Sequence, residues 1–224
     1  MTQTHAKTDT TTALIDGLVR AARSAQTALG SSSFATRQKA LHEAAKIIRA
    51  RTTDILASNQ KDLATAARSG LTEAFIDRLT LTEPRIEDMA VGLETIAAQP
   101  DPIGAELARW QRPNGLDITR QSTPLGVIGV IYESRPNVTV DAAGLCALAG
   151  NAVILRGGSD SQHSASLLAE AMVEGLQAAG LPGAAVQIVN TTDRAAVGAM
   201  LVAVGGIDVI IPRGGKSLVE RVQR

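Results

Sequence analysis

The sequence predicts an α/β protein in which several N-terminal helices precede a parallel sheet of the Rossmann type. Apolar residues recur at helical spacing through about the first 100 residues, which is typical of amphipathic helices. From about residue 124 onward, short β-branched runs alternate with helical segments, the pattern of a parallel sheet with helices on its faces. Between the two parts, residues 107–121 carry the turn signal of a β-hairpin.

The composition excludes several classes of function. The 224 residues include 22 basic and 22 acidic side chains and only 2% aromatic residues, so the sequence offers neither the basic surface nor the stacking platforms that nucleic acids require. Cys146 is the single cysteine, which precludes an internal disulfide and fits a reducing compartment. The polar N-terminus lacks a signal core, and no run approaches the ~18 apolar residues of a membrane span. We therefore expect a cytoplasmic protein that binds neither nucleic acid nor membrane.

The first part of the chain is predicted to be a disordered tail followed by helices. Residues 1–12 are polar and rich in threonine, so we expect them to be disordered. The expected helices cover about 14–29, 34–48, 54–70, 72–79 and 82–98, with caps at 31–33 and Thr82. We interpret His42 and the Lys and Arg side chains of these helices as solvated, and we find no ligand-like cluster in 79–86. This region should form a helical layer on the sheet.

Residues 107–121 read LARWQRPNGLDITRQ, in which Asn114-Gly115 is the turn signal of the hairpin. Pro113 has no N–H for a strand ladder, so the hairpin should lie at an edge or protrude. An exposed hairpin that carries Trp110, the only tryptophan, suggests that subunits pair by strand addition. A hairpin that folds against its own subunit is the alternative, and the sequence leaves both open.

The centre of the chain, residues 124–158, reads as a strand, a buried helix and a second strand. Residues 125–132 and 153–155 are β-branched runs, and 138–149 is apolar nearly all round, which predicts a right-handed βαβ unit. The elements expected after it are a helix over 161–179, a strand over 186–189, a helix over 192–203, a strand over 208–211 and a helix from 216. Ligands of such sheets sit at the carboxyl ends of the strands.

Glu133, Ser134, Arg135 and Asn137 crowd the end of the first of these strands. Arg135 offers two parallel N–H donors to a carboxylate or phosphate. The amide of Asn137 is the kind of donor that stabilises a developing oxyanion. The alternative is structural: Ser134 or Asn137 would cap the helix, and Arg135 would be solvated.

Two glycine pairs, Gly157-Gly158 and Gly214-Gly215, lie between a predicted strand and a predicted helix. Glycine there allows a phosphate or ribose to approach backbone N–H groups, although a plain turn explains each pair equally well. No Rossmann fingerprint follows a predicted strand, and GGKS at 214–217 lacks the first glycine of a Walker A loop.

Cys146 lies in the buried helix of the central unit. An apolar environment raises the pKa of a thiol and makes it inert, so we interpret Cys146 as core packing. The three histidines are far apart and have no metal-ligand spacing. We expect no metal site.

Five stretches resemble one known family: SGLTEAFIDRLTLTEPRI at 69–86, PLGVIGVIYESRPNVTVDA at 124–142, GNAVILRGGSD at 150–160, GLPGAAVQIVN at 180–190 and IDVIIPRGG at 207–215. YESRPNVT together with LRGG and IPRGG is highly specific. The combination resembles the gamma-glutamyl phosphate reductase (glutamate-5-semialdehyde dehydrogenase) family of the aldehyde dehydrogenase superfamily. A relative with a non-phosphorylated substrate is disfavoured by ESRPN and LRGG. The resemblance implies an aldehyde-dehydrogenase-like α/β fold.

The resemblance also implies an oxidoreductase activity. The reaction would be NADPH-dependent reduction of L-glutamyl 5-phosphate to L-glutamate 5-semialdehyde and phosphate, a step of L-proline biosynthesis. In that family a cysteine thiolate displaces phosphate, and hydride from NADPH reduces the resulting thioester. A homo-oligomer formed through the 107–121 hairpin and an association with glutamate 5-kinase are implied as well.

Carried over residue by residue, the resemblance assigns positions to the cofactor NADP(H) and to the substrate. The cofactor positions follow the strands: Tyr132, Glu133, Arg156, Gly157, Gly158, Ser159, Asn190, Pro212, Arg213, Gly214 and Gly215. The substrate positions are Ser134, Arg135 and Asn137. Arg156 matches the basic position that faces the adenosine ribose. Ser159 stands where related proteins often have lysine, which leaves the choice between NADP and NAD open.

We divide the chain into a helical lead-in (1–106), a hairpin arm for oligomerisation (107–121) and an incomplete Rossmann-like NADP-binding domain (122–224). The family's nucleophilic cysteine lies in a catalytic domain beyond these positions. We therefore expect the chain to be truncated, with its catalytic domain absent, and to be inactive alone. A non-catalytic fragment that binds NADP(H) or dimerises is the alternative.

Overall fold

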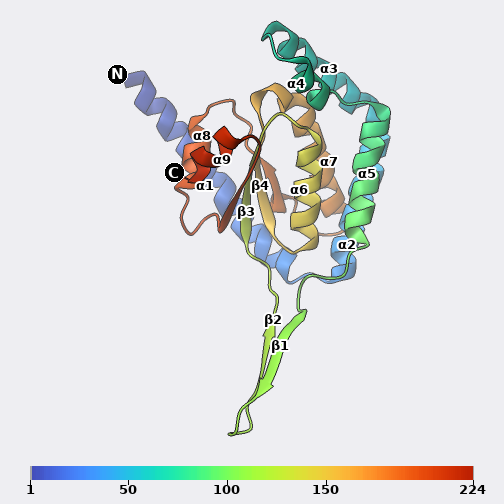
Figure 1. The fold of residues 1–224 in the computed structure, drawn as a ribbon, viewed down its shortest axis with the longest axis vertical. Helices are drawn as coiled ribbons and strands as arrows, with labels where there is room; N and C mark the ends of the chain where they lie inside the picture. Colours follow the sequence, from blue (N-terminus) through green and yellow to red (C-terminus); the bar gives the residue numbers. More distant parts are fainter. Residues whose placement is uncertain (1, 224) are drawn as a thin grey trace.

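A computed structural model describes residues 2–223 of the chain. Its centre is a four-stranded sheet in which all neighbouring strands are parallel, in the order β5-β4-β3-β6 (Figure 1). The strands are β3 (Val127–Tyr132), β4 (Ala152–Arg156), β5 (Val186–Ile188) and β6 (Val209–Arg213). The predicted alternation of strands and helices is confirmed.

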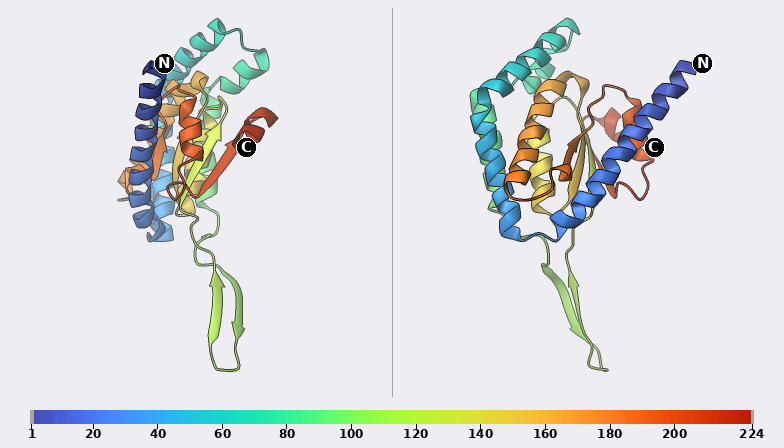
Figure 2. Two further views of the ribbon diagram at one scale, coloured as in Figure 1. Left: turned by 90° about the vertical axis from the view of Figure 1, so that its left-hand side faces the viewer. Right: turned by 180° about the vertical axis from the view of Figure 1, so that it is seen from behind.

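The helices that connect the strands cover both faces of the sheet (Figure 1 and Figure 2). α6 (Asn137–Leu148) and α7 (Gln162–Ala178) pack together on one face, while α8 (Ala195–Leu201) lies beside α1 (Thr2–Gly30) on the other. The chain steps from β3 to β4 to β5 in one direction and then returns past β3 to β6. Because parallel crossovers are right-handed, the returning connection places its helix on the opposite face. α9 (Lys216–Gln223) follows β6.

The helices of the lead-in occupy both sides of this core. α1 packs against β3, β4 and β5, whereas α2 (Phe34–Ala50) and α5 (Glu83–Ala97) form an outer layer over α6 and α7. α3 (Thr52–Arg68) and α4 (Glu73–Leu79) lie near the end of the molecule toward which the strands point (Figure 1). The predicted caps at Ser33 and Thr82 are confirmed, because each side chain accepts a hydrogen bond from the backbone N–H three residues on.

Residues 2–12 are helical, so the expected disordered N-terminus is wrong for this part of the chain; residue 1 lies outside the described residues. The side chain of Thr11 is buried and donates a hydrogen bond to Asp193 (3.0 Å). An existing helix gains one backbone hydrogen bond for each residue that extends it. The helix that is held at Thr11 therefore continues into this polar segment.

Arg37 on α2 is buried, which corrects the interpretation of all lead-in Arg side chains as solvated. Its guanidinium donates to the Leu148 carbonyl oxygen (2.9 Å) and to both carboxylate oxygens of Asp101 (2.8 and 3.0 Å). Burial of a charge is tolerated where an opposite charge and further hydrogen bonds satisfy it. Arg37 thus joins α2 to the end of α6 and to the segment that leads into the hairpin.

β1 (Glu106–Gln111) and β2 (Asp117–Gln121) form an antiparallel hairpin that projects away from the rest of the molecule (Figure 1 and Figure 2). In its turn Gly115 has a φ of 87°, and the Asn114 side chain accepts a hydrogen bond from the Leu116 N–H (3.2 Å). The predicted protruding hairpin is confirmed, and the alternative of a hairpin folded against its own subunit is wrong. Trp110 remains 39% exposed.

One cluster of buried apolar side chains joins the lead-in helices to the sheet. Although α1 is 29 residues long, no helix within residues 2–223 has the apolar length needed to cross a membrane.

Candidate functional site

The loops at the carboxyl ends of the four strands lie along one edge of the sheet. The loop at 133–136 follows β3, and the loop at 157–161 follows β4. The strand order changes direction between β3 and β6, and open parallel sheets bind ligands at such a switch point. The clusters that the sequence singles out therefore lie on the edge where a ligand is expected.

A first cavity lies at this switch point, and we call it the strand-end cavity. It has a volume of about 360 Å³ and is lined by Arg78, Glu133, Arg135, Arg213, Gly214 and Gly215. The Glu133 carboxylate accepts a hydrogen bond from the Gly215 N–H (2.7 Å), which joins the end of β3 to the loop after β6. A Cβ atom at Gly214 would lie 2.7 Å from the Glu133 carboxyl carbon. A side chain at position 214 would therefore displace the Glu133 carboxyl group.

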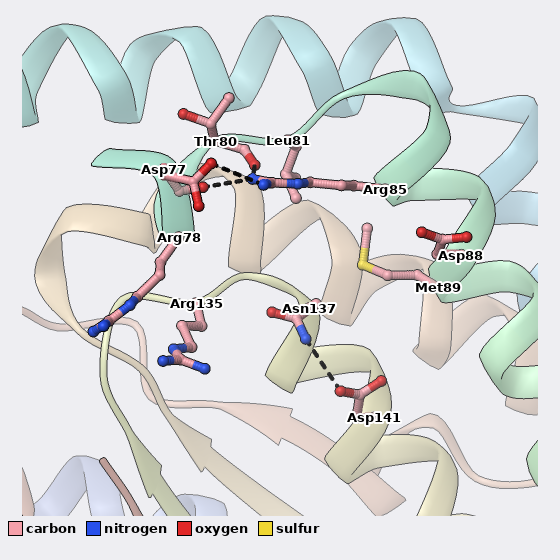
Figure 3. Close-up of a pocket in the computed structure, with 10 residues that line it drawn as sticks. All are labelled: Asp77, Arg78, Thr80, Leu81, Arg85, Asp88, Met89, Arg135, Asn137 and Asp141. Atoms are coloured by element: carbon pink, nitrogen blue, oxygen red, sulfur yellow. Dashed lines mark hydrogen bonds and ion pairs between the residues drawn. The ribbon is translucent and has the colours of Figure 1, made fainter. Parts of the chain in front are cut away.

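A second cavity, which we call the α4–α6 cavity, is bounded by α4, α5 and the start of α6 (Figure 3). It has a volume of about 340 Å³ and is lined by Asp77, Arg78, Thr80, Leu81, Arg85, Asp88, Met89, Arg135, Asn137 and Asp141. Arg78 and Arg135 border both cavities. Figure 3 shows these two arginines side by side, with Asn137 and Asp141 along the same wall of the cavity.

The α4–α6 cavity corrects the expectation that 79–86 contains no ligand-like cluster, because Thr80, Leu81 and Arg85 line it. The fold brings this segment to residues more than fifty positions further along the chain. Sequence reasoning also missed Arg78 and Asp141. The only available signal was that both lie inside stretches that resemble the reductase family, at 69–86 and 124–142.

Part of the charge in the α4–α6 cavity is paired within the protein. Arg85 donates to the Asp77 carboxylate (2.9 Å) and to the Thr80 carbonyl oxygen (2.7 Å). The Asn137 amide donates to the Asp141 carboxylate (3.2 Å). Burial raises the pKa of Asp141, although the positive charge of Arg213 and the Asn137 hydrogen bond act in the opposite direction.

The arginines at the junction of the two cavities are not paired in this way. Among the described side chains, none forms an ion pair with Arg78, Arg135 or Arg213. Glu133 is the one carboxylate that lines the strand-end cavity, and it already accepts the Gly215 hydrogen bond. Guanidinium groups bind carboxylates and phosphates through two parallel hydrogen bonds. The junction is therefore suited to a small anionic ligand.

Neither Ser134 nor Asn137 caps α6. Pro136 is the N-cap residue, and no side chain accepts a hydrogen bond there. The Ser134 hydroxyl instead donates to Asp160 (3.1 Å), and Asn137 binds Asp141. The capping part of the structural alternative is therefore wrong, whereas Arg135 is exposed, as that alternative expects. The Asn137 amide lies in the cavity wall.

A groove lies at the ends of β4 and β5, and we call it the β4–β5 groove. It is lined by Arg156, Gly157, Gly158, Ser159, Gln162, Ala165, Ile188, Val189 and Thr191. Arg156 is only 8% exposed, and its Nε has no hydrogen-bond partner among the described residues. Burial lowers the pKa of this guanidinium. A buried cation with an open donor favours a ligand that brings oxygen atoms or negative charge.

Gly157 and Gly158 are required by contacts inside the protein. A Cβ atom would lie 3.0 Å from the Tyr132 ring at Gly157, and 2.2 Å from the Ser134 hydroxyl at Gly158. Tyr132 and Ser134 are themselves buried. The Tyr132 hydroxyl bonds to that of Thr139 (2.7 Å), and burial raises the Tyr132 pKa to about 12. The structure therefore places Tyr132 and Ser134 against the glycine loop, and they line neither cavity.

Three further positions lie away from the two cavities. Asn190 accepts a hydrogen bond from Gln162 at the β4–β5 groove (2.7 Å), and Pro212 pairs with Ile131 inside the sheet. Cys146 is 6% exposed, and burial raises the pKa of its thiol to about 12. The predicted core position of Cys146 is confirmed. No group of His, Cys, Asp and Glu in the described part of the chain is arranged to hold a metal.

Comparison with known proteins assigns this arrangement to a family. The sequence pattern of the aldehyde dehydrogenase family matches residues 2–224. The chain belongs to the aldehyde dehydrogenase family. The match covers the lead-in, the hairpin and the sheet together, and the predicted aldehyde-dehydrogenase-like α/β fold is confirmed.

Individual relatives show a more specific similarity than the family pattern does. The gamma-glutamyl phosphate reductase of Gluconobacter oxydans (strain 621H) is 60% identical over 211 residues, which cover 94% of this chain and 49% of that protein. The reductase of Brucella suis biovar 1 is 58% identical over 205 residues, which cover 91% of this chain and 49% of that protein. The crystal structure of gamma-glutamyl phosphate reductase from Thermotoga maritima matches with a TM-score of 0.91 at 35% identity. The match covers 94% of this chain and 50% of that chain. The chain spans about half the length of these relatives, and the resemblance drawn from the sequence motifs is confirmed.

Proposed function

We propose that this member of the aldehyde dehydrogenase family is the cofactor-binding portion of a gamma-glutamyl phosphate reductase. The reaction is the reduction of L-glutamyl 5-phosphate by NADPH to L-glutamate 5-semialdehyde and phosphate, in L-proline biosynthesis. The observation that supports it is the convergence of Arg78, Arg135 and Arg213 at the switch point of the sheet. An acyl phosphate is a small anion of the kind that such a cluster binds.

The loops after β4 and β6 fit a dinucleotide such as NADP(H). Arg156 lines the β4–β5 groove beside Ser159, and its positive charge supports a place for the ribose and its phosphate there. Gly214 and Gly215 line the strand-end cavity without side chains, which leaves room for the pyrophosphate. Tyr132 supports the glycine loop from within the core. When bound, NADP(H) supplies the hydride that reduces the acyl group.

Arg135 and Asn137 are the proposed substrate residues. Arg135 borders both cavities, so its guanidinium can bind an anionic group at their junction. The Asn137 amide lies in the wall of the α4–α6 cavity. The carbonyl oxygen of an acyl phosphate gains negative charge when a nucleophile adds to it, and an amide donor stabilises that charge.

Cys146 is not the nucleophile of this reaction. Its thiol is buried in α6 and has a pKa of about 12, so almost none of it is thiolate at neutral pH. We therefore propose that the 224-residue chain alone does not turn over the substrate.

The proposal extends to partners and location. The exposed hairpin with Trp110 supports a homo-oligomer that pairs through residues 107–121. A single, buried thiol fits the reducing cytoplasm. Acyl phosphates hydrolyse readily in water, and direct transfer from glutamate 5-kinase to this protein would protect the substrate.

The test compares the complete gene product with the 224-residue chain. We expect the complete product to oxidise L-glutamate 5-semialdehyde in the presence of phosphate and NADP⁺, which is the reverse reaction, and to retain this activity in a Cys146→Ala variant. The 224-residue chain should bind NADPH in calorimetry, more tightly than NADH, without turnover.

A complete gene product without this activity would overturn the proposed function. If the chain then still bound NADPH, the result would favour the alternative of a non-catalytic NADP(H)-binding or dimerising fragment. Turnover by the 224-residue chain would overturn its proposed inactivity.

A further inference from the structure

We propose that Arg78 binds the α-carboxylate of the substrate and that Asp141 binds its α-ammonium group, so that the α4–α6 cavity recognises the amino-acid end of the proposed substrate. This inference rests on the proposed function and deepens it, because it concerns the end of the substrate that does not react. Arg78 comes from α4 in the lead-in, and Asp141 from the second turn of α6.

Arg78 is placed to bind a carboxylate. Its side chain extends from the last turn of α4 toward Arg135, and both border the α4–α6 cavity (Figure 3). No described side chain forms an ion pair with either arginine, and the remaining arginine of this wall, Arg85, is already bonded to Asp77. Arg78 is thus an available, exposed cation on the wall of the α4–α6 cavity, and like Arg135 it also borders the strand-end cavity.

Asp141 is placed to bind an ammonium group. Its carboxylate is partly buried and one of its oxygens accepts the Asn137 hydrogen bond, which leaves further acceptor capacity toward the cavity. Burial disfavours the negative charge of the Asp141 carboxylate. A positively charged group of the ligand would offset this cost. The site therefore gains more from an amino group than from a neutral ligand.

The other carboxylates of the cavity fit this role less well. Asp77 is occupied by Arg85, and Asp88 lies on the exposed surface of α5. Glu133 lines the strand-end cavity, where it binds the Gly215 N–H. Asp141 is thus the one partly buried carboxylate among the residues that line the cavity, where it lies next to Asn137 (Figure 3).

One cation and one anion in the same cavity recognise a zwitterion. With the amino-acid end in the α4–α6 cavity, the acyl phosphate end lies toward the strand-end cavity, where Arg135 and Arg213 remain to bind phosphate. The substrate class is then an α-amino acid with an activated carboxyl group on its side chain. A plain aliphatic acyl phosphate lacks both recognised groups.

The test uses the complete gene product and three aldehydes, oxidised with phosphate and NADP⁺. L-Glutamate 5-semialdehyde carries both charged groups, 5-oxopentanoate lacks the amino group, and pentanal lacks both. Removing a hydrogen bond to a charged group weakens binding by about 10- to 100-fold. We expect Asp141→Asn to lower kcat/KM for the semialdehyde by this factor and to leave 5-oxopentanoate unchanged. Arg78→Gln should lower both, and by more than it lowers the value for pentanal.

Arg68→Gln, at the exposed end of the neighbouring helix α3, is the matched control and should change none of the three values. Thermal melting should be the same in every variant, and NADPH affinity should be the same in Asp141→Asn and Arg68→Gln, which distinguishes loss of recognition from misfolding. If the unmodified protein oxidised the semialdehyde but a variant kept its preference among the three aldehydes, the assignment of that residue would be overturned. Failure of the unmodified protein to oxidise any of them would instead overturn the proposed function.

Discussion

Asp208, directly before β6, joins the start of two strands to α1. One of its carboxylate oxygens accepts the Val127 N–H at the start of β3 (2.7 Å), and the other accepts the Arg23 guanidinium (2.6 Å). The hydrogen bond from Arg23 is the main cause that lowers the pKa of Asp208, and the Val127 N–H acts in the same direction. Asp208 therefore contributes to the stability of the fold in its charged form.

We predict that Asp208→Asn lowers the free energy of unfolding at pH 7 by about 1 kcal/mol, a small value because both partners are about one third exposed. A carboxyl whose pKa is lowered by folding stabilises the protein above its ordinary pKa of 3.8. The difference between variant and unmodified chain should therefore be complete above pH 4 or so and disappear as the pH falls further. Urea denaturation from pH 7 to pH 3 measures it.

The control for this prediction is Asp16→Asn, on the exposed side of α1. It should leave the free energy of unfolding at pH 7 unchanged. A constant difference between Asp208→Asn and the unmodified chain across the pH range would contradict the role of the charge.

At the scale of residues, the sequence reveals a site residue when a local pattern fixes its place. Glu133, Arg135 and Asn137 directly follow a strand that is recognisable from its β-branched run, so they could be placed at the sheet edge. Arg78 and Asp141 lie on helices, where a cavity wall and a solvated face have the same composition. Their position depends on how helices pack, which no spacing in the sequence records.

At the scale of elements, α2 and α7 cross closely at Gly175. A Cβ atom there would lie 2.6 Å from the Ala44 Cβ and 2.7 Å from the Ala40 carbonyl oxygen. We predict that Gly175→Ala lowers the free energy of unfolding by about 1–3 kcal/mol, because the backbone of α2 must move to admit the methyl group. Urea or thermal denaturation measures the change.

Gly198 in α8 is the matched control, since a Cβ atom there meets nothing within 4 Å. Gly198→Ala should be neutral or stabilise the chain by about 0.5–1 kcal/mol, because alanine restricts the unfolded state and favours a helix. Equal stabilities of the two variants would show that α2 and α7 do not constrain each other at Gly175.

Most elements could be predicted because their signals are local. The strands appear as β-branched runs, and α5 begins at a capping threonine. The start of α1 could not be predicted, since a polar segment is helical there as the continuation of a 29-residue helix whose Thr11 contacts the body of the protein. α6 was expected to be buried on every side, but Leu145 is 54% exposed. A buried helix and a helix with one open face differ too little in composition to be distinguished.

At the scale of the whole molecule, the alternation of elements predicts a parallel sheet but not the order of its strands. A right-handed crossover is compatible with a step to either side of β3. The structure places β6 next to β3 and so brings the loop after β6 to Glu133. The strand-end cavity follows from this order, which is why the sequence indicated its loops separately and not their contact.

The hairpin is the part of the molecule for which we propose a role that needs a second copy of the chain. Trp110 and Ile118 are paired across β1 and β2, on strands that project from the body (Figure 2). We predict that Trp110→Asp makes the chain monomeric at concentrations where the unmodified chain and Trp110→Phe are oligomeric, because a buried charge opposes pairing while a smaller aromatic ring preserves it. Sedimentation velocity measures the mass.

As the only tryptophan, Trp110 also reports directly on assembly. Its fluorescence emission in the unmodified chain should shift to longer wavelength on dilution, because the ring passes from a contact between subunits to water. The same mass for all three proteins, with an emission that is independent of concentration, would show that the hairpin does not mediate assembly.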